Sequence, residues 1–380
     1  MNMTSRILET LLRVNITEDS WREALEEHKV VADEFDGIPY YRFVKKVGML
    51  EKGSVVAGAE IIFNFPRIAR ILHLENGIKM TFTKPFYVEE KVDGYNVRVA
   101  KIEDKVLAFT RGSYVCPFST DRLENFFNIE KFFTENPSLI ICGEIAGPGN
   151  PYNREYPSYI TDDVKFFAFD IRVKNTDREV HVEERYKLFD TYRIPTVTRY
   201  GKYAFSQSDR EKIKRNLKEL DDKGCEGVVL KPTDSAEKTV KYVTIGSCHR
   251  DMKVTSSLML ETPAEFFTQR IIRSVFYLLE HKIPLDEVIL KKTGESLMQP
   301  IFERVMKAIQ EEMIGEEFQV RLNKKQNVKR LFDHFRKCKV DVVINSQRKI
   351  GKYWQVKFQR RCFPTYEIIN KYWNGLSHFD

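Results

Sequence analysis

The sequence predicts an α+β protein with several domains. Between residues 84 and 245, short runs rich in β-branched and aromatic residues are separated by turn residues, a pattern typical of β-strands. After residue 250, apolar residues recur at three- and four-residue spacing over 265–279, 296–313 and 327–337, which predicts helices. The chain of 380 residues is longer than one hydrophobic core usually supports, so we expect roughly two to four domains.

Composition limits the class of protein and of partner. The chain is 42% hydrophobic and 31% charged, as globular proteins are. It contains no apolar run of about 18 residues and no signal-peptide core, so we expect no membrane association and a cytoplasmic location. The six cysteines are scattered singly, which argues against a zinc site and a disulfide framework. A net charge of +7 is compatible with a polyanionic partner.

The first part of the chain is expected to form a small α+β module. Residues 16–35 have helical spacing, with Thr17 as the cap and His28 on the apolar stripe. From residue 40 to 71, short strand-like runs are separated by glycines. We therefore expect one helix followed by strands ahead of the central region.

The stretch EEKVDGYNVR at 89–98 places a lysine between two strand-like runs. Asp93 and Gly94 form a turn dipeptide, and 97–102 alternates as a half-buried strand does. The pattern predicts a β-hairpin with Lys91 at its lip. An amine in that position can act as a nucleophile. An exposed lysine at a strand end is the alternative that this stretch alone leaves open.

Further charged residues stand at later strand ends and turns. Glu144 follows a buried apolar run and precedes a loop rich in glycine and proline, where site residues are common. The run 165–171 is aromatic on both faces, so its phenylalanines either pack in the core or stack on a base. The other charged positions of this kind are Arg111, Glu226, Lys231, Lys238 and Lys241.

Taken in order, these motifs resemble those of the covalent nucleotidyltransferases, the superfamily of DNA ligases, RNA ligases and mRNA capping enzymes. KVDGYN at 91–96 resembles the nucleophile motif KxDGxN, and TRG at 110–112 the arginine motif. CGE at 142–144, KFFAFD at 165–170 and EGVVLK at 226–231 resemble the third, aromatic and fourth motifs. TVKY at 239–242 is similar to a variant of the fifth.

The flanking regions are similar to those of archaeal homodimeric ATP-dependent RNA ligases. A small N-terminal module precedes the motifs, and helices follow them instead of an oligonucleotide-binding barrel. The resemblance implies an ATP-grasp-like ligase domain of antiparallel sheets with helices. The implied domains are an N-terminal module (1–66), the adenylyltransferase domain (67–247), helical dimerisation domain (248–315) and small C-terminal α+β domain (316–380).

The resemblance also implies the roles of the site residues. Lys91 becomes lysyl-AMP, Lys241 contacts the α-phosphate of ATP, and Glu226 holds Mg²⁺ or Mn²⁺. Phosphate chemistry requires such charge neutralisation. Lys231 and Lys238 are less certain helpers, because the fifth motif usually has two lysines closer together. The remaining residues implied to bind ATP are Glu89, Glu90, Asn96, Arg98, Arg111, Glu144 and Phe167, with Phe166 as the alternative to Phe167.

The function implied is the joining of RNA 5′-phosphate and 3′-hydroxyl ends through lysyl-AMP and RNA-adenylate. We expect neighbouring lysines to lower the pKa of Lys91 and so make it a better nucleophile. A DNA ligase or capping guanylyltransferase is the alternative within enzymes. A catalytically silent nucleic-acid-binding dimer is the alternative outside them, although binding alone needs charge rather than this ordered mixture of acids and lysines.

Overall fold

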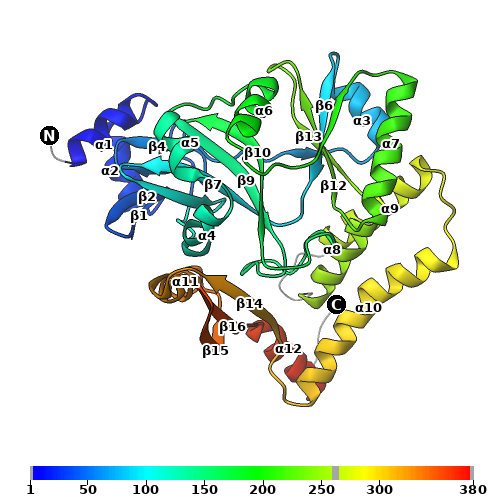
Figure 1. Cartoon of the computed structure of the whole chain (residues 1–380). Coiled ribbons are helices and arrows are strands. Elements are labelled where there is room, and N and C mark those ends of the chain that lie inside the picture. The colour runs from blue at the N-terminus through cyan, green and yellow to red at the C-terminus, as the bar shows by residue number, and fades with distance from the viewer. Residues whose placement is uncertain (1–2, 259–264, 377–380) are drawn as a thin grey trace.

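The computed structural model describes residues 3–258 and 265–376, and it confirms the expected α+β class with antiparallel sheets (Figure 1). None of the helices described is both long and apolar enough to cross a membrane. The N-terminal part has two helices and a sheet of order β1-β2-β3-β4. Its elements are α1 (Met3–Leu12), α2 (Glu18–Glu26), β1 (Val30–Phe35), β2 (Ile38–Phe43), β3 (Val55–Ala57) and β4 (Glu60–Ile62).

The helix expected over 16–35 is wrong beyond Glu26. Thr17 caps α2 as expected, since its side chain accepts a hydrogen bond from the Ser20 amide. His28 then adopts a positive φ of 53°, which a helix does not tolerate, and lies exposed. The β-branched residues that follow pair with β2 instead of extending the helix.

Two sheets form the central region. The first has the order β10-β9-β7-β8 and the second β11-β6-β12-β13-β5. The strands of the first sheet are β7 (Tyr95–Ile102), β8 (Lys105–Thr110), β9 (Leu139–Ala146) and β10 (Lys165–Val173). Those of the second are β5 (Ala69–Arg70), β6 (Phe86–Lys91), β11 (Arg199–Tyr203), β12 (Gly227–Pro232) and β13 (Val240–Val243).

Helices cover the outer face of each sheet. Phe118, Phe132 and Phe189 pack against the first sheet, and Ile78 and Leu217 against the second. The helices are α3 (Leu74–Thr81), α4 (Pro117–Arg122), the 3₁₀ turn η1 (Leu123–Asn125), α5 (Ile129–Glu135), α6 (Val182–Thr191) and α7 (Gln207–Asp222). The N-terminal module covers part of the inner face of the first sheet, and the rest of that face lies opposite the second sheet.

The expected hairpin around Lys91 is wrong, because β6 and β7 belong to different sheets. Asp93 and Gly94 carry the chain from one sheet to the other. A Cβ at Gly94 would lie 2.4 Å from the carbonyl oxygen of Ile145, so only glycine fits this crossing. The turn dipeptide was recognised, but a local pattern does not tell a hairpin turn from a crossing between sheets.

The helical region and a small C-terminal sheet follow, and α10 connects them in Figure 1. The helix expected over 296–313 begins earlier, because Asp286 caps it and it continues through Pro300. The sheet has the order β14-β16-β15. These elements are α8 (Ile245–Ser257), α9 (Glu265–Glu280), α10 (Glu287–Ile309), β14 (Gly315–Leu322), α11 (Lys325–Lys337), β15 (Val342–Ile350), β16 (Tyr353–Arg361) and α12 (Phe363–Trp373).

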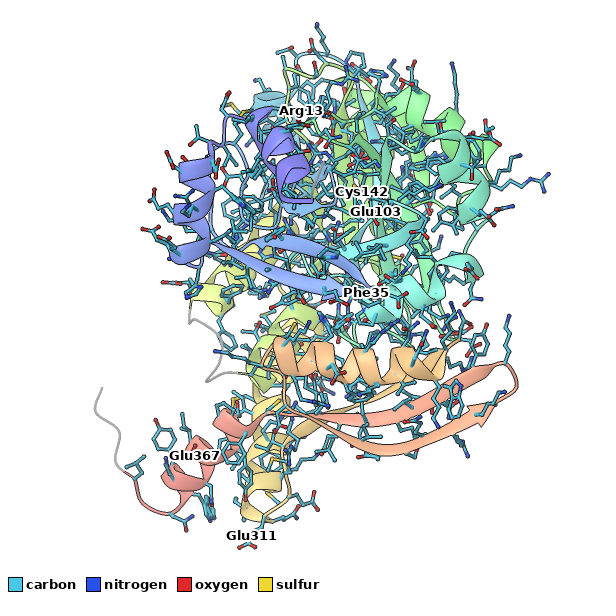
Figure 2. The ribbon with its side chains drawn as sticks, turned by 90° about the vertical axis from the view of Figure 1, so that its left-hand side faces the viewer. Arg13, Phe35, Glu103, Cys142, Glu311 and Glu367 are labelled. Atoms are coloured by element: carbon cyan, nitrogen blue, oxygen red, sulfur yellow. The ribbon has the colours of Figure 1, made fainter. Side chains whose placement is uncertain are left out.

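The C-terminal sheet docks on the central region through α11. Phe335 and Phe358 share one hydrophobic cluster with Phe118 of α4. Figure 2 shows α11 lying between the C-terminal sheet and the rest of the chain, with Phe35 beside it. The Arg330 guanidinium stands 5.1 Å from the Phe35 ring centroid. Helix α11 thus contacts both the N-terminal hairpin and the central region.

Arg98 ties the N-terminal module to the first sheet. Its guanidinium is fully buried and donates to the carbonyl oxygens of Phe63, Gly53 and Thr110 at 2.6, 2.8 and 2.9 Å. Burial lowers the pKa of Arg98 to about 10. Arg98 therefore joins backbone segments and does not belong to a ligand site.

We expect Arg98→Met to destabilise the protein by at least about 3 kcal/mol, because three buried carbonyl oxygens each lose a donor at about 1–3 kcal/mol. Urea unfolding followed by circular dichroism measures the change. Arg22→Met, at an exposed helical ion pair, is the control and should change stability by less than about 0.5 kcal/mol. Equal effects of the two variants would contradict this role of Arg98.

Candidate functional site

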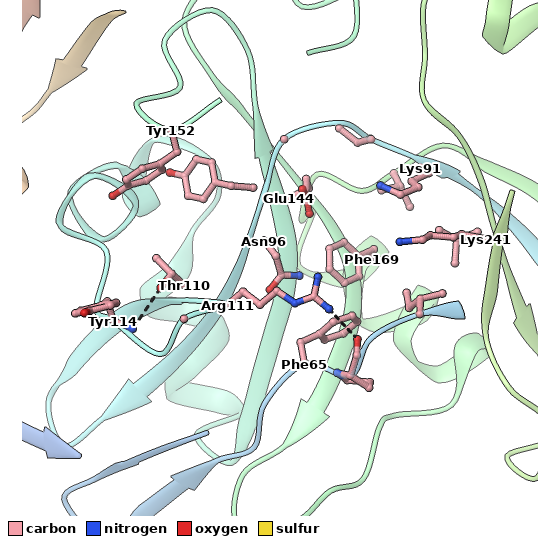
Figure 3. Close-up of a pocket in the computed structure, with 18 of the residues that line it drawn as sticks. Phe65, Lys91, Asn96, Thr110, Arg111, Tyr114, Glu144, Tyr152, Phe169 and Lys241 are labelled. Atoms are coloured by element: carbon pink, nitrogen blue, oxygen red, sulfur yellow. Dashed lines mark hydrogen bonds between the residues drawn. The ribbon is translucent and has the colours of Figure 1, made fainter. Parts of the chain in front are cut away.

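A cavity of about 580 Å³ opens between the inner faces of the two sheets. Strands from both sheets, the segment around Phe65 and the end of α11 line it (Figure 3). The cavity brings together eight of the residues singled out in the sequence: Glu89, Glu90, Lys91, Asn96, Arg111, Glu144, Lys231 and Lys241.

Strand register explains why these side chains meet. Alternate residues of a strand share a face, so Glu89 and Lys91 project from β6 to the same side. Val229 of β12 lies opposite Glu89 on one side and Lys241 of β13 on the other. On the first sheet, Asn96 of β7 lies opposite Glu144 of β9. Each sheet thus presents a row of polar groups to the other.

Lys91 and Glu226 form an ion pair at the edge of this cavity. The Lys91 Nζ donates a hydrogen bond to a carboxylate oxygen of Glu226. Gly227 makes this possible, because it pairs with Lys91 and has a φ of +150°. A Cβ there would lie 2.2 Å from the Tyr242 carbonyl oxygen, so glycine alone allows the close approach of β12 and β13.

The electrostatics of the two lysines differ from the expectation. Burial lowers the pKa of Lys91, but the carboxylates of Glu226 and Glu144 outweigh burial and raise it above its ordinary value. The lowered pKa expected for Lys91 is therefore wrong, and it is Lys241 whose pKa is lowered. Burial, together with Lys91 and Arg70, lowers the pKa of Lys241 to about 8.

Carboxylates close to Lys91 hold protons unusually well. Burial, with the Glu226 carboxylate as a further cause, raises the pKa of Glu144 to about 8 and that of Asp93 to about 7. Acidic groups that repel each other in a buried site favour a positive ligand. No group of three or more metal-ligating side chains occurs among the described residues. This donor set fits Mg²⁺ or Mn²⁺ bound by one or two carboxylates together with substrate phosphates.

Glu89 and Lys231 belong to a buried ionic network that the sequence reasoning did not foresee. Lys231 Nζ lies 2.8 Å from Glu89 Oε2 and 3.2 Å from Asp170 Oδ1, and Arg185 also contacts both carboxylates. Glu90 accepts hydrogen bonds from the hydroxyls of Tyr159 and Thr198. These contacts hold β6 rigidly beneath Lys91. Asp170 is the last residue of the aromatic motif, but no sequence signal pointed to Arg185.

The aromatic wall is formed by Phe169. Phe169 lines the cavity, whereas Phe167 packs beside Tyr159, with ring centroids 6.4 Å apart. Phe166 points to the opposite face and stacks on Phe126, 5.8 Å away in the core. The alternation of a strand places Phe167 and Phe169 on one face, and this signal was available in the sequence.

Asn96 and Arg111 present unused hydrogen-bonding groups. The Asn96 Oδ1 is buried without a hydrogen-bond partner in the described part of the chain. Such an atom is costly unless a ligand donates to it, and a ribose hydroxyl has that chemistry. Arg111 stands at the rim, with its Nη2 3.5 Å from the Pro66 carbonyl oxygen. Figure 3 shows its guanidinium beside Phe65 and Phe169.

Four of the residues expected to bind ATP do not line the cavity, namely Phe167, described above, and Arg98, Phe166 and Lys238. Arg98 is a buried structural arginine, because it lies deeper on the same strand, under the N-terminal module. Phe166 lies in the core. Lys238 is exposed in the loop before β13 and does not line the cavity. No second lysine of the fifth motif therefore accompanies Lys241.

Comparison with known proteins agrees with this geometry. The family model for RNA ligases matches residues 84–243, and the model for the C-terminal region of the ligase Pab1020 matches residues 254–376. An Aquifex aeolicus chain named as a candidate ATP-dependent DNA ligase is 33% identical, with a TM-score of 0.91 over 96% of this chain and 100% of its own. An archaeal ATP-dependent RNA ligase is 29% identical, with a TM-score of 0.89 over 96% and 98%.

A further relative is also similar to this chain over nearly its whole length. An uncharacterised protein of Methanocaldococcus jannaschii is 28% identical over 96% of this chain and 94% of its own. These relatives span the N-terminal module, the two-sheet region, the helices and the C-terminal sheet, so the similarity is not confined to the motifs. The chain belongs to the RNA ligase family and combines its ligase domain with the C-terminal region described for Pab1020.

Proposed function

We propose that the protein is an ATP-dependent RNA ligase that joins a 5′-phosphate to a 3′-hydroxyl. The observation that carries this proposal is the cavity in which Lys91, hydrogen-bonded to Glu226, and Lys241 from one sheet meet Glu144 from the opposed sheet. A nucleophile, a carboxylate and a cation within reach of one bound nucleotide are what nucleotidyl transfer to lysine requires.

The first step is adenylation of Lys91. Its Nζ loses a proton, for which Glu226 is the hydrogen-bonded acceptor, and attacks the α-phosphorus of ATP. The bond from the α-phosphorus to the bridging oxygen breaks, and pyrophosphate leaves with the electron pair. An RNA 5′-phosphate then displaces Lys91 from AMP, and attack by a 3′-hydroxyl on the adenylated 5′-phosphate releases AMP and joins the strand.

The chain's own residues position the nucleotide for these steps. Phe169 and Val229 line the cavity from different sheets, and their apolar surfaces suit the faces of adenine. Asn96 and Glu144 offer oxygen atoms to the ribose, and Lys241 neutralises phosphate charge. Glu226 is the ligand we propose for Mg²⁺ or Mn²⁺. When bound, the cation supplies charge neutralisation at the transferring phosphoryl group.

We propose RNA rather than DNA as the substrate. Support comes from the RNA ligase model over 84–243 and from the archaeal RNA ligase of similar fold. The Aquifex aeolicus relative, named as a candidate DNA ligase, keeps DNA as the second candidate. Comparison of RNA and DNA strands of identical sequence as substrates separates the two.

We also propose that the protein is a cytoplasmic homodimer with the four domains 1–66, 67–247, 248–315 and 316–380. An exposed apolar face on α10 supports the dimer, since Met298 and Phe302, one turn apart, are 67% and 65% exposed. We expect light scattering to give twice the chain mass of 44.8 kDa, and Phe302→Glu to give the monomer mass. A monomeric wild type would rule the dimer out.

Incubation with α-labelled ATP and Mg²⁺ should attach one label per chain to the wild type and none to Lys91→Ala. The substitution removes the only atom that can carry the phosphoramidate bond. Lys165→Ala, at an exposed lysine that begins β10, is the matched control and should label normally. The labelled enzyme should then join RNA ends and release AMP. A wild type that takes no label would disprove the proposed function.

The enzyme should bind ATP more weakly in the adenylation step as the pH rises through about 8, because Lys241 loses its charge there. Between pH 7 and pH 9 the protonated fraction of such a group falls about tenfold, and the KM for ATP should rise correspondingly. Arginine stays charged over this range, so Lys241→Arg should lack the rise. If both enzymes show the same pH dependence, Glu144 or another group is responsible and not Lys241.

A further inference from the structure

A second cavity of about 540 Å³ adjoins the first on the far side of Lys241. The two cavities share Ile68 and Lys241 in their walls. The second lies between strand β5 and helix α9, and apart from Lys241 its lining residues lie outside the motifs recognised in the sequence. The charged side chains that line it are all cationic: Arg70, Lys241, Arg270 and Arg273.

Arg70 lies where a second lysine of the fifth motif is missing. Strand β5 pairs in parallel with β13, and Arg70 is the register partner of Lys241. Side chains at paired positions of neighbouring strands point to the same face, so the two cations stand side by side. Their mutual repulsion contributes to the lowered pKa of Lys241. A neighbouring strand thus supplies the cation that the fifth motif lacks.

Arg270 and Arg273 of α9 approach the same space with hydrogen-bonding capacity left over. Arg270 Nε lies 3.3 Å and Arg273 Nη1 3.8 Å from Asp251 Oδ2, the carboxylate that faces both. Both nitrogens are buried without a hydrogen-bond partner in the described part of the chain, and Arg273 is only 7% exposed. The two arginines share the single carboxylate of Asp251, which leaves one positive charge in excess. A buried donor nitrogen without a hydrogen bond is costly, so an anionic ligand is expected here.

We propose that this second cavity binds the β- and γ-phosphates of ATP and then the pyrophosphate that leaves. The inference rests on the proposed function, because it assigns the leaving-group side of the same reaction. When the bond to the bridging oxygen breaks, pyrophosphate gains negative charge. Lys241 stands between the two cavities, next to the α-phosphate on one side and to three arginines on the other. The cavity places cations where that charge develops.

The competing explanation is structural, with Arg270 and Arg273 only tying α9 to α8 through Asp251. That role predicts that substituting these arginines lowers the rate of every step of the reaction equally. Pyrophosphate binding predicts that the substitutions lower the rate only of the steps that form or consume pyrophosphate. Sealing of pre-adenylated RNA bypasses those steps and therefore separates the two explanations.

The test uses the full-length variants Arg70→Gln, Arg270→Gln and Arg273→Gln. We expect each to slow adenylation by ATP, and to raise the pyrophosphate concentration needed to regenerate ATP from the lysyl-AMP enzyme, by about tenfold to hundredfold. Sealing of pre-adenylated RNA should stay within twofold of wild type. Lys291→Gln, at an exposed lysine of α10 outside the cavity, is the control and should behave as wild type in all three assays.

The outcomes are distinct. Unchanged adenylation and unchanged pyrophosphate dependence in all three variants would overturn the proposal while leaving the ligase function intact. Parallel loss in the sealing of pre-adenylated RNA would assign the arginines a structural role and also overturn it. Arg70 is less deeply buried than Arg273, so Arg70→Gln keeps the test decisive if the variants of α9 do not fold. A wild type that takes no label at all overturns both proposals.

Discussion

The site depends on the ion pair between Lys91 and Glu226. This pair joins the end of β6 to the start of β12, at the point where the chain crosses between the two sheets. It requires Gly94 to allow the crossing and Gly227 to allow the close approach of β12 to β13. The pair also holds Lys91 protonated in the free protein, so the charged lysine waits beside the carboxylate that can accept its proton. Under the proposed function, Lys91 must lose that proton before it can attack ATP.

Regions outside the motifs complete the environment of this pair. Arg98 holds the N-terminal module against β7 and β8, and the segment that follows the module contributes Phe65 and Ile68 to the cavity wall. Helix α11 contributes His334 and Phe335 from the opposite side. Burial lowers the pKa of His334 to about 4, so this side chain is neutral at physiological pH and adds no charge to the wall. The charged side chains that line the two cavities come from the two sheets, the turn after β8 and α9.

Local patterns predicted a large part of the site. Lys91, Glu144, Glu226 and Lys241 could be found because each stands in a short motif at a strand end, where backbone geometry is set by neighbouring residues. The errors have physical causes as well. The hairpin expected around Lys91 depended on which strands pair, and the depressed pKa expected for Lys91 depended on which carboxylate lies nearest. Phe169 was missed in favour of Phe167, although strand alternation puts both on one face. Tertiary packing places Phe169 in the cavity wall and Phe167 beside Tyr159.

By itself, the sequence determined the class of the protein and the order of its motifs, and it predicted Lys91 as the nucleophile, because these depend on residue types at short spacing. Only the tertiary structure decided that Arg98 is a structural tether, that Lys91 is paired with Glu226, and that Arg70, Arg270 and Arg273 gather beside Lys241. Those facts arise from contacts between residues up to about two hundred positions apart, which pair through sheet register and helix packing. No local pattern encodes such contacts, because they form only when separate segments are buried against one another.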